Sequence, residues 1–261
     1  NEESIWYGGP VNRNNPDLKK YLPQIRELIW GGEIKKAEEL MVMAMSGCPN
    51  GVHPYQTLGD INIRFDAQGE IKEYRRTLDL EQALCRITYT AGDVNYTREI
   101  FVSKPADAMI MRITADRKGS ISLCATMGRE KYFDGIVAEE GQMLYLYGNT
   151  GRGSHEFAMK LHAWNDGGSV KTIGEHLLVE DADEVILTFT ADTAYHYTKE
   201  EKETAIAEYL EKNPKLPYLC STEGRSSYEL AELQMQQALQ DFLSKKINER
   251  ILRCKQKEFE K

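Results

Sequence analysis

Aromatic and amide side chains near the start of the chain have the chemistry of a sugar-binding surface. They are Trp6, His53, Tyr55 and Gln56. His53 stands in a loop bounded by glycine and proline, directly before the first predicted strand, and functional residues concentrate in such loops. Aromatic rings cover the apolar side of a sugar ring, while amides bind its hydroxyl groups. These residues predict a carbohydrate surface at a substrate entrance, with plain loop packing as the alternative.

No catalytic constellation emerges from the remaining residues. The five histidines form no local metal-binding pair, and no nucleophile elbow, phosphate loop or dinucleotide fingerprint occurs. The glycine-rich stretch 148–153 opens no helix, which predicts a hairpin loop. Acidic pairs such as Glu139 and Glu140 read as turn charges, because a general acid needs an enclosed site. We therefore expect no catalytic residue, no metal and no cofactor in this chain.

The composition excludes several classes of protein. With 261 residues, 41% hydrophobic and 28% charged, the chain is globular and not disordered. Its net charge of −8 argues against nucleic acid as a partner. No apolar run approaches the ~18 residues of a membrane helix, so we expect no membrane partner. Five scattered cysteines favour a reducing compartment such as the cytoplasm over a disulfide framework.

Residues 14–47 predict a helical insert. Asn15 and Pro16 read as the cap and first residue of a helix that Pro23 restarts and that Gly31 and Gly32 end. A second helix is predicted from about residue 33 to 45, with alanines and leucine on its apolar side.

From residue 58 to 190 apolar residues recur at every second position, in place of the helical spacing seen before. Alternating runs include Ile61–Phe65, Ile121–Ala125 and Phe157–Ala163, and glycine-containing turns separate them. About ten such strands without intervening helices predict an antiparallel two-layer sandwich, so the chain reads as mainly β. His162 falls opposite the apolar face of its strand, which predicts a solvated side chain.

After residue 195 the pattern becomes helical again. Residues 198–210 predict a charged helix, and Ser226 with Glu229 forms a capping-box pattern for a second one. The second helix carries a broad apolar face that includes Phe242, Leu243 and Ile247. We expect this face to be exposed in the 261-residue chain, where it would bind hydrophobic dyes or form a homodimer.

Six motifs give the chain a family resemblance. In order along the sequence they are Asn1–Pro10, Arg13–Pro16, Leu22–Leu28, Tyr55–Asp60, Tyr74–Leu80 and Tyr96–Phe101. They resemble the start of the family 95 glycoside hydrolases, the α-L-fucosidases, over residues 1–195.

The resemblance implies a fold and an activity for the parent protein. Members of that family open with a β-supersandwich, continue through a helical linker and end in an (α/α)6 barrel that holds the active site. They hydrolyse terminal, typically α-1,2-linked α-L-fucosides with inversion and without a metal. The implied division is a sandwich domain at 1–195 and a linker at 196–261. The implied partners are a fucosylated oligosaccharide and the catalytic barrel of the same protein.

The sequence departs from that pattern at both ends. It does not begin with Met, and neither the strand pair that precedes the Asn1 motif in the family nor the barrel is found. We expect an exposed sheet edge where those strands would pair, and we expect the chain alone to be inactive. A stand-alone carbohydrate-binding module and a purely structural domain are the two alternatives.

Overall fold

The computed structural model describes residues 5–9, 12–51, 53–151, 154–213 and 227–258; for 227–229, 232 and 255–258 it describes the backbone only. Contacts divide the chain into two compact units. The sandwich unit comprises Asn1–Ile5, Thr57–Thr150 and His155–Lys261, and the hairpin unit comprises Trp6–Gln56 and Gly151–Ser154. No helix within the described ranges is long and apolar enough to cross a membrane.

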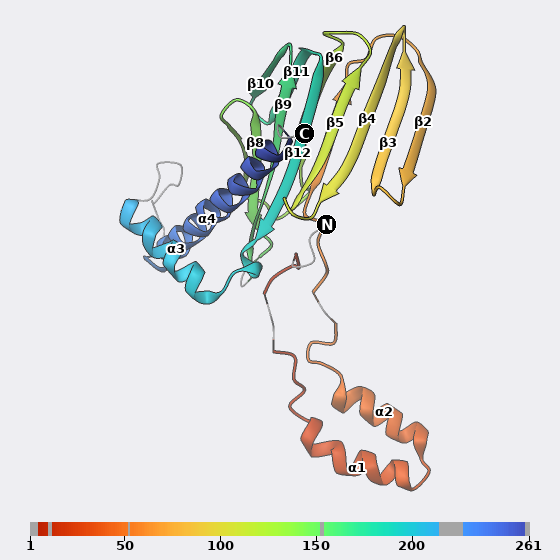
Figure 1. Ribbon diagram of the computed structural model, residues 1–261. Helices are drawn as coiled ribbons and strands as arrows, with labels where there is room; N and C mark the ends of the chain where they lie inside the picture. The colour runs from red at the N-terminus through yellow and green to blue at the C-terminus, as the bar shows by residue number, and fades with distance from the viewer. Residues whose placement is uncertain (1–4, 10–11, 52, 152–153, 214–226, 259–261) are drawn as a thin grey trace. The chain divides into compact units, whose positions relative to one another are not determined.

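The described part of the sandwich unit holds two antiparallel sheets, which confirms the predicted mainly-β, two-layer fold (Figure 1). The smaller sheet has the order β1-β6-β11-β10 and the larger the order β2-β3-β4-β5-β12-β9-β8-β7. The strands are β1 (Asp60–Phe65), β2 (Ile71–Asp79), β3 (Leu84–Ala91), β4 (Val94–Ser103), β5 (Ala108–Ala115), β6 (Ile121–Gly128), β7 (Gly135–Glu139), β8 (Met143–Asn149), β9 (Glu156–Asp166), β10 (Ser169–Ile173), β11 (His176–Ala182) and β12 (Glu184–Thr193).

Alternation of side chains builds the core between the sheets. In β6, Ile121, Leu123 and Ala125 are fully buried, and the residues between them are only partly covered. They meet the inward residues of β9 from the opposite sheet in one hydrophobic cluster. Glycines close the hairpins: at Gly168, where φ is +61°, a Cβ would lie 2.1 Å from the carbonyl oxygen of Glu180.

Two antiparallel helices form the predicted insert in the hairpin unit: α1 (Leu18–Trp30) and α2 (Ile34–Met45) (Figure 1). Asp17 and not Asn15 stands at the cap of α1, and Pro23 lies inside that helix. Asn15 instead ties the start of α1 to the end of α2, because its Nδ2 donates to the carbonyl oxygens of Met43 at 3.0 Å and Ser46 at 3.1 Å.

The C-terminal part of the chain is helical, as predicted. A short 3-10 turn, η1 (Ala194–His196), precedes α3 (Lys199–Lys212) and α4 (Ser227–Glu258). The cap of α3 is a full capping box, because Thr198 accepts from the amide of Glu201 while the Glu201 carboxylate accepts from the amide of Thr198. The capping box predicted at residues 226 and 229 lies outside the described side chains.

The helix α4 lies on the outer face of the larger sheet, and it is not exposed there. Leu243 and Ile247 are 0% exposed, and Ile251 is 5% exposed. They pack on Tyr145 of β8 and Ala158 of β9. The expected exposure of Phe242, Leu243 and Ile247 is therefore wrong, and the expected dye binding and homodimer lose the support of that face. Periodicity showed an apolar face but not that the chain's own sheet covers it.

Strand β9 is buried on both faces for the same reason. Its inward residues belong to the core, and its outward residues Glu156, Ala158, Lys160 and His162 lie among the buried residues of the chain. His162 is 7% exposed and packs against the ring of Trp164 at 4.2 Å between centroids. The prediction of a solvated His162 is therefore wrong, because a helix distant in sequence covers its side of the strand.

The buried Lys160 on this face is bonded to Glu139 of β7 and to two polar residues of α4. Lys160, 0% exposed, places its Nζ 2.5 Å from Glu139 Oε2, 2.9 Å from Ser244 Oγ and 2.9 Å from Asn248 Oδ1. A buried cation with three hydrogen-bond acceptors avoids most of the penalty of desolvation. These bonds also fix the position of α4 along the sheet.

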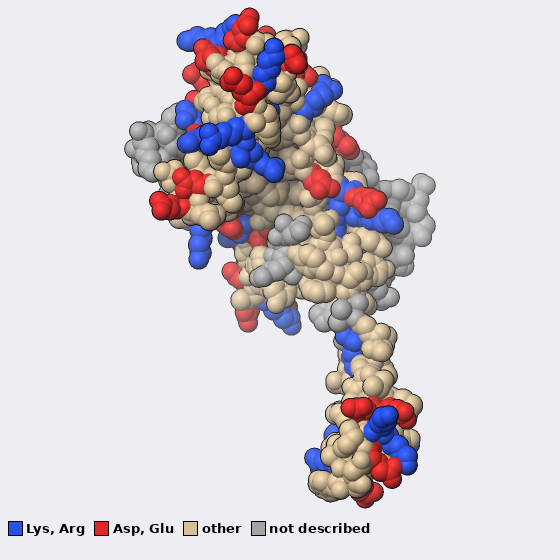
Figure 2. All heavy atoms as spheres, turned by 90° about the vertical axis from the view of Figure 1, so that its right-hand side faces the viewer, with Lys and Arg blue, Asp and Glu red and all other residues tan. Residues whose placement is uncertain are grey.

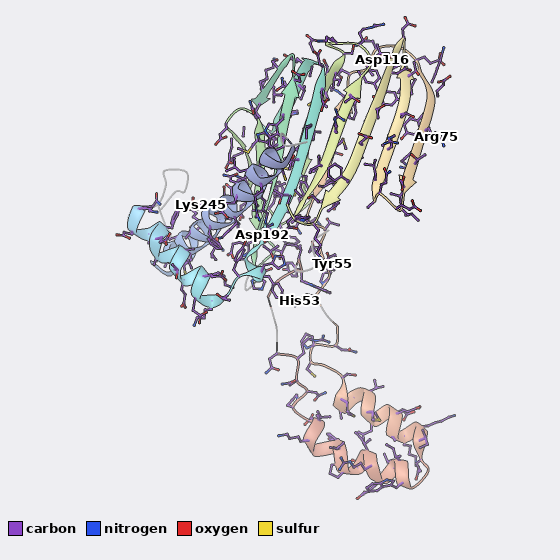
Figure 3. All side chains as sticks on the ribbon, viewed as in Figure 1. His53, Tyr55, Arg75, Asp116, Asp192 and Lys245 are labelled. Atoms are coloured by element: carbon purple, nitrogen blue, oxygen red, sulfur yellow. The ribbon has the colours of Figure 1, made fainter. Side chains whose placement is uncertain are left out.

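A second buried charge joins the end of β12 to the same helix. The Asp192 side chain is 0% exposed, and its Oδ2 accepts from Arg250 Nη2 at 2.7 Å and from the Tyr197 hydroxyl at 2.5 Å. Figure 3 shows Asp192 at the end of its strand next to α4. Burial and the bond to Asp192 raise the pKa of Tyr197 far above its usual range, so the phenol remains a donor.

We expect Arg250→Ala to lower the free energy of unfolding by about 3–5 kcal/mol, because it leaves the Asp192 carboxylate buried without its cation. Urea denaturation followed by circular dichroism measures this change. Arg253→Ala, exposed on the same helix, is the matched control and should stay within about 0.5 kcal/mol of the parent. Adding Asp192→Asn to Arg250→Ala should cost less than the sum of the two single changes; strict additivity would contradict the pairing.

Candidate functional site

Three of the four predicted site residues lie together in the hairpin unit. Trp6 and Tyr55 form an antiparallel β-bridge, and their rings meet edge to face with centroids 5.3 Å apart. The amide of Tyr7 donates to the carbonyl of Pro54 at 3.1 Å, which continues the pairing. Two loop segments that are about fifty residues apart in sequence are thereby held side by side.

His53 is oriented by a backbone bond. Its Nδ1 lies 2.6 Å from the carbonyl oxygen of Tyr7, and its ring lies 5.8 Å from the Tyr7 ring. A carbonyl oxygen only accepts, so Nδ1 must carry the proton. In the neutral ring Nε2 is then an acceptor, a group that suits a sugar hydroxyl. Figure 3 shows His53 and Tyr55 near one another.

The cluster combines exposed rings with hydrogen-bonding groups. Trp6 is 42% and Tyr55 41% exposed, so part of each ring faces solvent. The loop between β8 and β9 supports them, since Ser154 Oγ donates to the carbonyl of Trp6 at 3.3 Å. Sequence reasoning missed Ser154 because no local signal links residues 148 positions apart.

Gln56 is placed differently from the other three predicted residues. It is partly buried, whereas Trp6 and Tyr55 are exposed. The motif continues into the core of the sandwich unit, where Leu58 is 5% exposed. A Cβ on Gly59 would stand 2.9 Å from the backbone carbonyl oxygen of Gly128, so this position favours glycine. Leu58 and Gly59, in the second half of the Tyr55–Asp60 motif, therefore serve packing of the core.

The described residues of the cluster contribute stacking and hydrogen-bonding groups. The hydrogen bonds and ring contacts that define the cluster come from aromatic rings, an imidazole, a serine hydroxyl and backbone groups. Among the described residues no group of three or more His, Cys, Asp and Glu is placed to hold a metal ion. Groups of these kinds supply ring stacking and hydrogen bonds.

A second polar cluster lies in the sandwich unit, where β8 ends and β9 begins. Glu156 is 8% exposed, and its Oε1 accepts from Asn149 Nδ2 at 3.3 Å. Burial raises the pKa of Glu156, and burial lowers the pKa of the neighbouring His155. The ring of His155 packs edge to face on Tyr195. A carboxyl group with a raised pKa is a common feature of active sites, but a buried structural network produces it as well.

The comparisons with known proteins place the chain in a class. Residues 1–198 match the model of the family described as "Glycosyl hydrolase family 65, N-terminal domain". The match covers most of the chain, and the chain therefore belongs to this family of N-terminal domains of glycoside hydrolases.

Its curated relatives are named as fucosidases. The chain is 29% identical over 221 residues to "Alpha-L-fucosidase 2" of Arabidopsis thaliana, covering 75% of this chain and 26% of the relative. It is 26% identical over 147 residues to "Probable alpha-fucosidase A" of Aspergillus oryzae, covering 53% and 18%. The protein of the same name from Aspergillus niger is 29% identical over 164 residues, covering 58% and 19%. The chain thus spans about a quarter or less of the length of these relatives.

We expect Glu156→Gln to stabilise the chain at neutral pH. Burial raises the pKa of Glu156 in the folded state above its ordinary value of 4.5. The folded state therefore binds the proton more tightly than the unfolded state, and the free energy of unfolding falls as the pH rises from 4.5 through the raised pKa. Glutamine keeps an acceptor for Asn149 without a charge, so the gain should be about 1 kcal/mol at pH 7 and vanish near pH 4.5. Thermal unfolding at several pH values measures it, with exposed Glu130→Gln as control. An equal gain at all pH values would contradict the burial of an ionised carboxylate.

Proposed function

We propose that this chain is the N-terminal, non-catalytic domain of an α-L-fucosidase. The observation that carries the proposal is the match of residues 1–198 to the N-terminal domain family together with similarity to relatives named as fucosidases. Residues 1–195 form the domain proper, and residues 196–261 lead to a catalytic (α/α)6 barrel in the same protein. The ordered motifs of the family 95 enzymes support assignment to that family, with hydrolysis of α-1,2-linked fucosides by inversion.

The proposed role of the domain is to support the barrel and to line the substrate entrance with Trp6, His53, Tyr55 and Gln56. The edge-to-face pair of Trp6 and Tyr55 supports this role, because its exposed ring surface suits the apolar side of a sugar. The oriented imidazole of His53 supplies an acceptor next to those rings. The glutamic acid and the water-activating residues of catalysis would lie in the barrel.

The same cluster favours a second candidate function, a carbohydrate-binding module that works without catalysis. The hydrogen bonds and ring contacts that build the cluster lie within this chain. Binding of a fucosylated glycan would then need no other domain. Titration of the 261-residue chain with 2′-fucosyllactose, followed by NMR chemical shifts, distinguishes the two functions. Saturable binding centred on Trp6 and Tyr55 would support the module.

Release of fucose from 2′-fucosyllactose tests the proposed function. We expect no release by the 261-residue chain and clear release by the full-length gene product that contains it, because the proton donor would lie in the barrel. Fucose is measured with a coupled fucose dehydrogenase. Release by the 261-residue chain would move the chemistry into this domain, and no release by either protein would remove the fucosidase assignment.

We expect Tyr55→Ala combined with Gln56→Ala to lower kcat/KM of the full-length enzyme about tenfold, equivalent to about 1.4 kcal/mol of lost binding. Tyr55→Phe keeps the ring and should restore most of the rate. Tyr74→Ala is the matched control, since Tyr74 is 60% exposed on the edge strand β2, outside the hairpin unit. An unchanged kcat/KM in the double variant would exclude a role at the entrance.

A further inference from the structure

The helical hairpin of α1 and α2 buries little of its apolar surface. Of its 13 and 12 residues, only Ile25, Ala37 and Ala44 are buried. Trp30 is 80% exposed and Val42 65% exposed. Helices of this length are marginal in water on their own and gain their stability from packing an apolar face. The exposed residues therefore need an explanation.

Their spacing places the exposed residues on one face. Ile29 follows the buried Ile25 by four residues, and Met41 follows the buried Ala37 by four. Four residues rotate a side chain by about 40° around the helix axis, so each exposed residue lies at the same angle from the contact between the helices. Because the helices are antiparallel, equal rotations bring both residues to the same side of the pair. We call this side the apolar hairpin face. Its residues are Leu18, Ile29, Ile34, Met41 and Met45, with Trp30 and Val42 along its borders.

Charged residues lie outside the apolar hairpin face. Lys20, Glu27, Lys36 and Glu39 stand away from the contact between the helices, and Lys19, Arg26 and Glu38 border the face on its outer side. Figure 2 shows charged side chains of both signs on the hairpin beside an uncharged surface. A charged side opposite an apolar one is the pattern of an element with solvent on one side and a packed partner on the other.

We propose that the apolar hairpin face docks on the catalytic domain of the same protein; this inference rests on the proposed function. The hairpin lies within the matched N-terminal domain, while the chain spans only 26%, 18% and 19% of the three relatives. In those relatives most of the protein therefore lies outside this region and offers a partner. The hairpin and the aromatic cluster belong to one compact unit, so docking would hold Trp6, His53 and Tyr55 at the catalytic domain.

Methionine oxidation provides a direct test, because α2 carries probes on both sides. Met41 and Met45 belong to the apolar hairpin face, whereas Met43 lies between them in sequence, on another side, and is 68% exposed. Hydrogen peroxide oxidation, located by tandem mass spectrometry, is compared between the 261-residue chain and the full-length protein. We expect Met41 and Met45 to oxidise about tenfold more slowly in the full-length protein and Met43 to keep its rate.

A pair of variants of the full-length protein provides a second readout. Ile34→Ser removes an apolar side chain from the face and should restore much of the oxidation of Met45. Lys36→Ser, on the charged side of the same helix, is the matched control and should leave Met45 protected. A protected Met45 in the Ile34→Ser variant would contradict docking through this face.

Equal oxidation rates of Met41 and Met45 in both proteins would overturn the proposal. Slow oxidation already in the 261-residue chain would also overturn it: a dimer in analytical ultracentrifugation would assign the face to a second copy, and a monomer would assign it to the chain's own residues. Fucose release is measured on the same preparations. If Met41 and Met45 are protected but no fucose is released, the docking stands and the fucosidase assignment falls. If fucose is released but these methionines are not protected, the fucosidase assignment stands and the docking falls.

Discussion

The packing of α4 on the outer face of the larger sheet is the interaction on which the sandwich unit depends. It covers β8 and β9 with Leu243, Ile247 and Ile251. Each such side chain contributes about 1.5–3 kcal/mol when fully buried. It also removes Lys160 and Asp192 from water, and α4 supplies partners to both through Ser244, Asn248 and Arg250. The helix and the sheet face therefore require one another.

The remainder of the larger sheet shows what the same outer face becomes without a helix. Across β3, β4, β5 and β12, Arg86, Glu99, Arg112 and Glu184 form a ladder of alternating charge. Glu184 receives two hydrogen bonds of 2.8 Å from Arg112. These side chains remain partly hydrated, so their pairs contribute little to stability but keep this half of the sheet solvated. The buried apolar cluster of this outer face and the buried Lys160 lie where α4 packs.

The hairpin unit follows a different plan from the sandwich unit. The sandwich unit has a large core between its sheets, whereas the hairpin unit buries few residues and carries exposed rings in its loops and an exposed apolar face on its helices. Ile5, directly before its main segment, and Leu58, two residues after it, are both buried in the sandwich core. The two units thus differ in how much apolar surface they bury.

The sequence by itself determined the local structure: strands from period-two alternation, as at Ile121–Ala125, turns from glycines such as Gly168, and the two helices of the insert. It also indicated the aromatic cluster, because Trp6 and Tyr55 stand in motifs of recognisable chemistry. Only the tertiary structure decided that His162 is buried, that the larger sheet covers the apolar face of α4, and that Ser154 bonds to the backbone of Trp6. Periodicity reports that a residue faces an apolar surface or solvent within its own element. Which distant element covers that surface depends on contacts between residues about a hundred positions apart, and no local pattern encodes them.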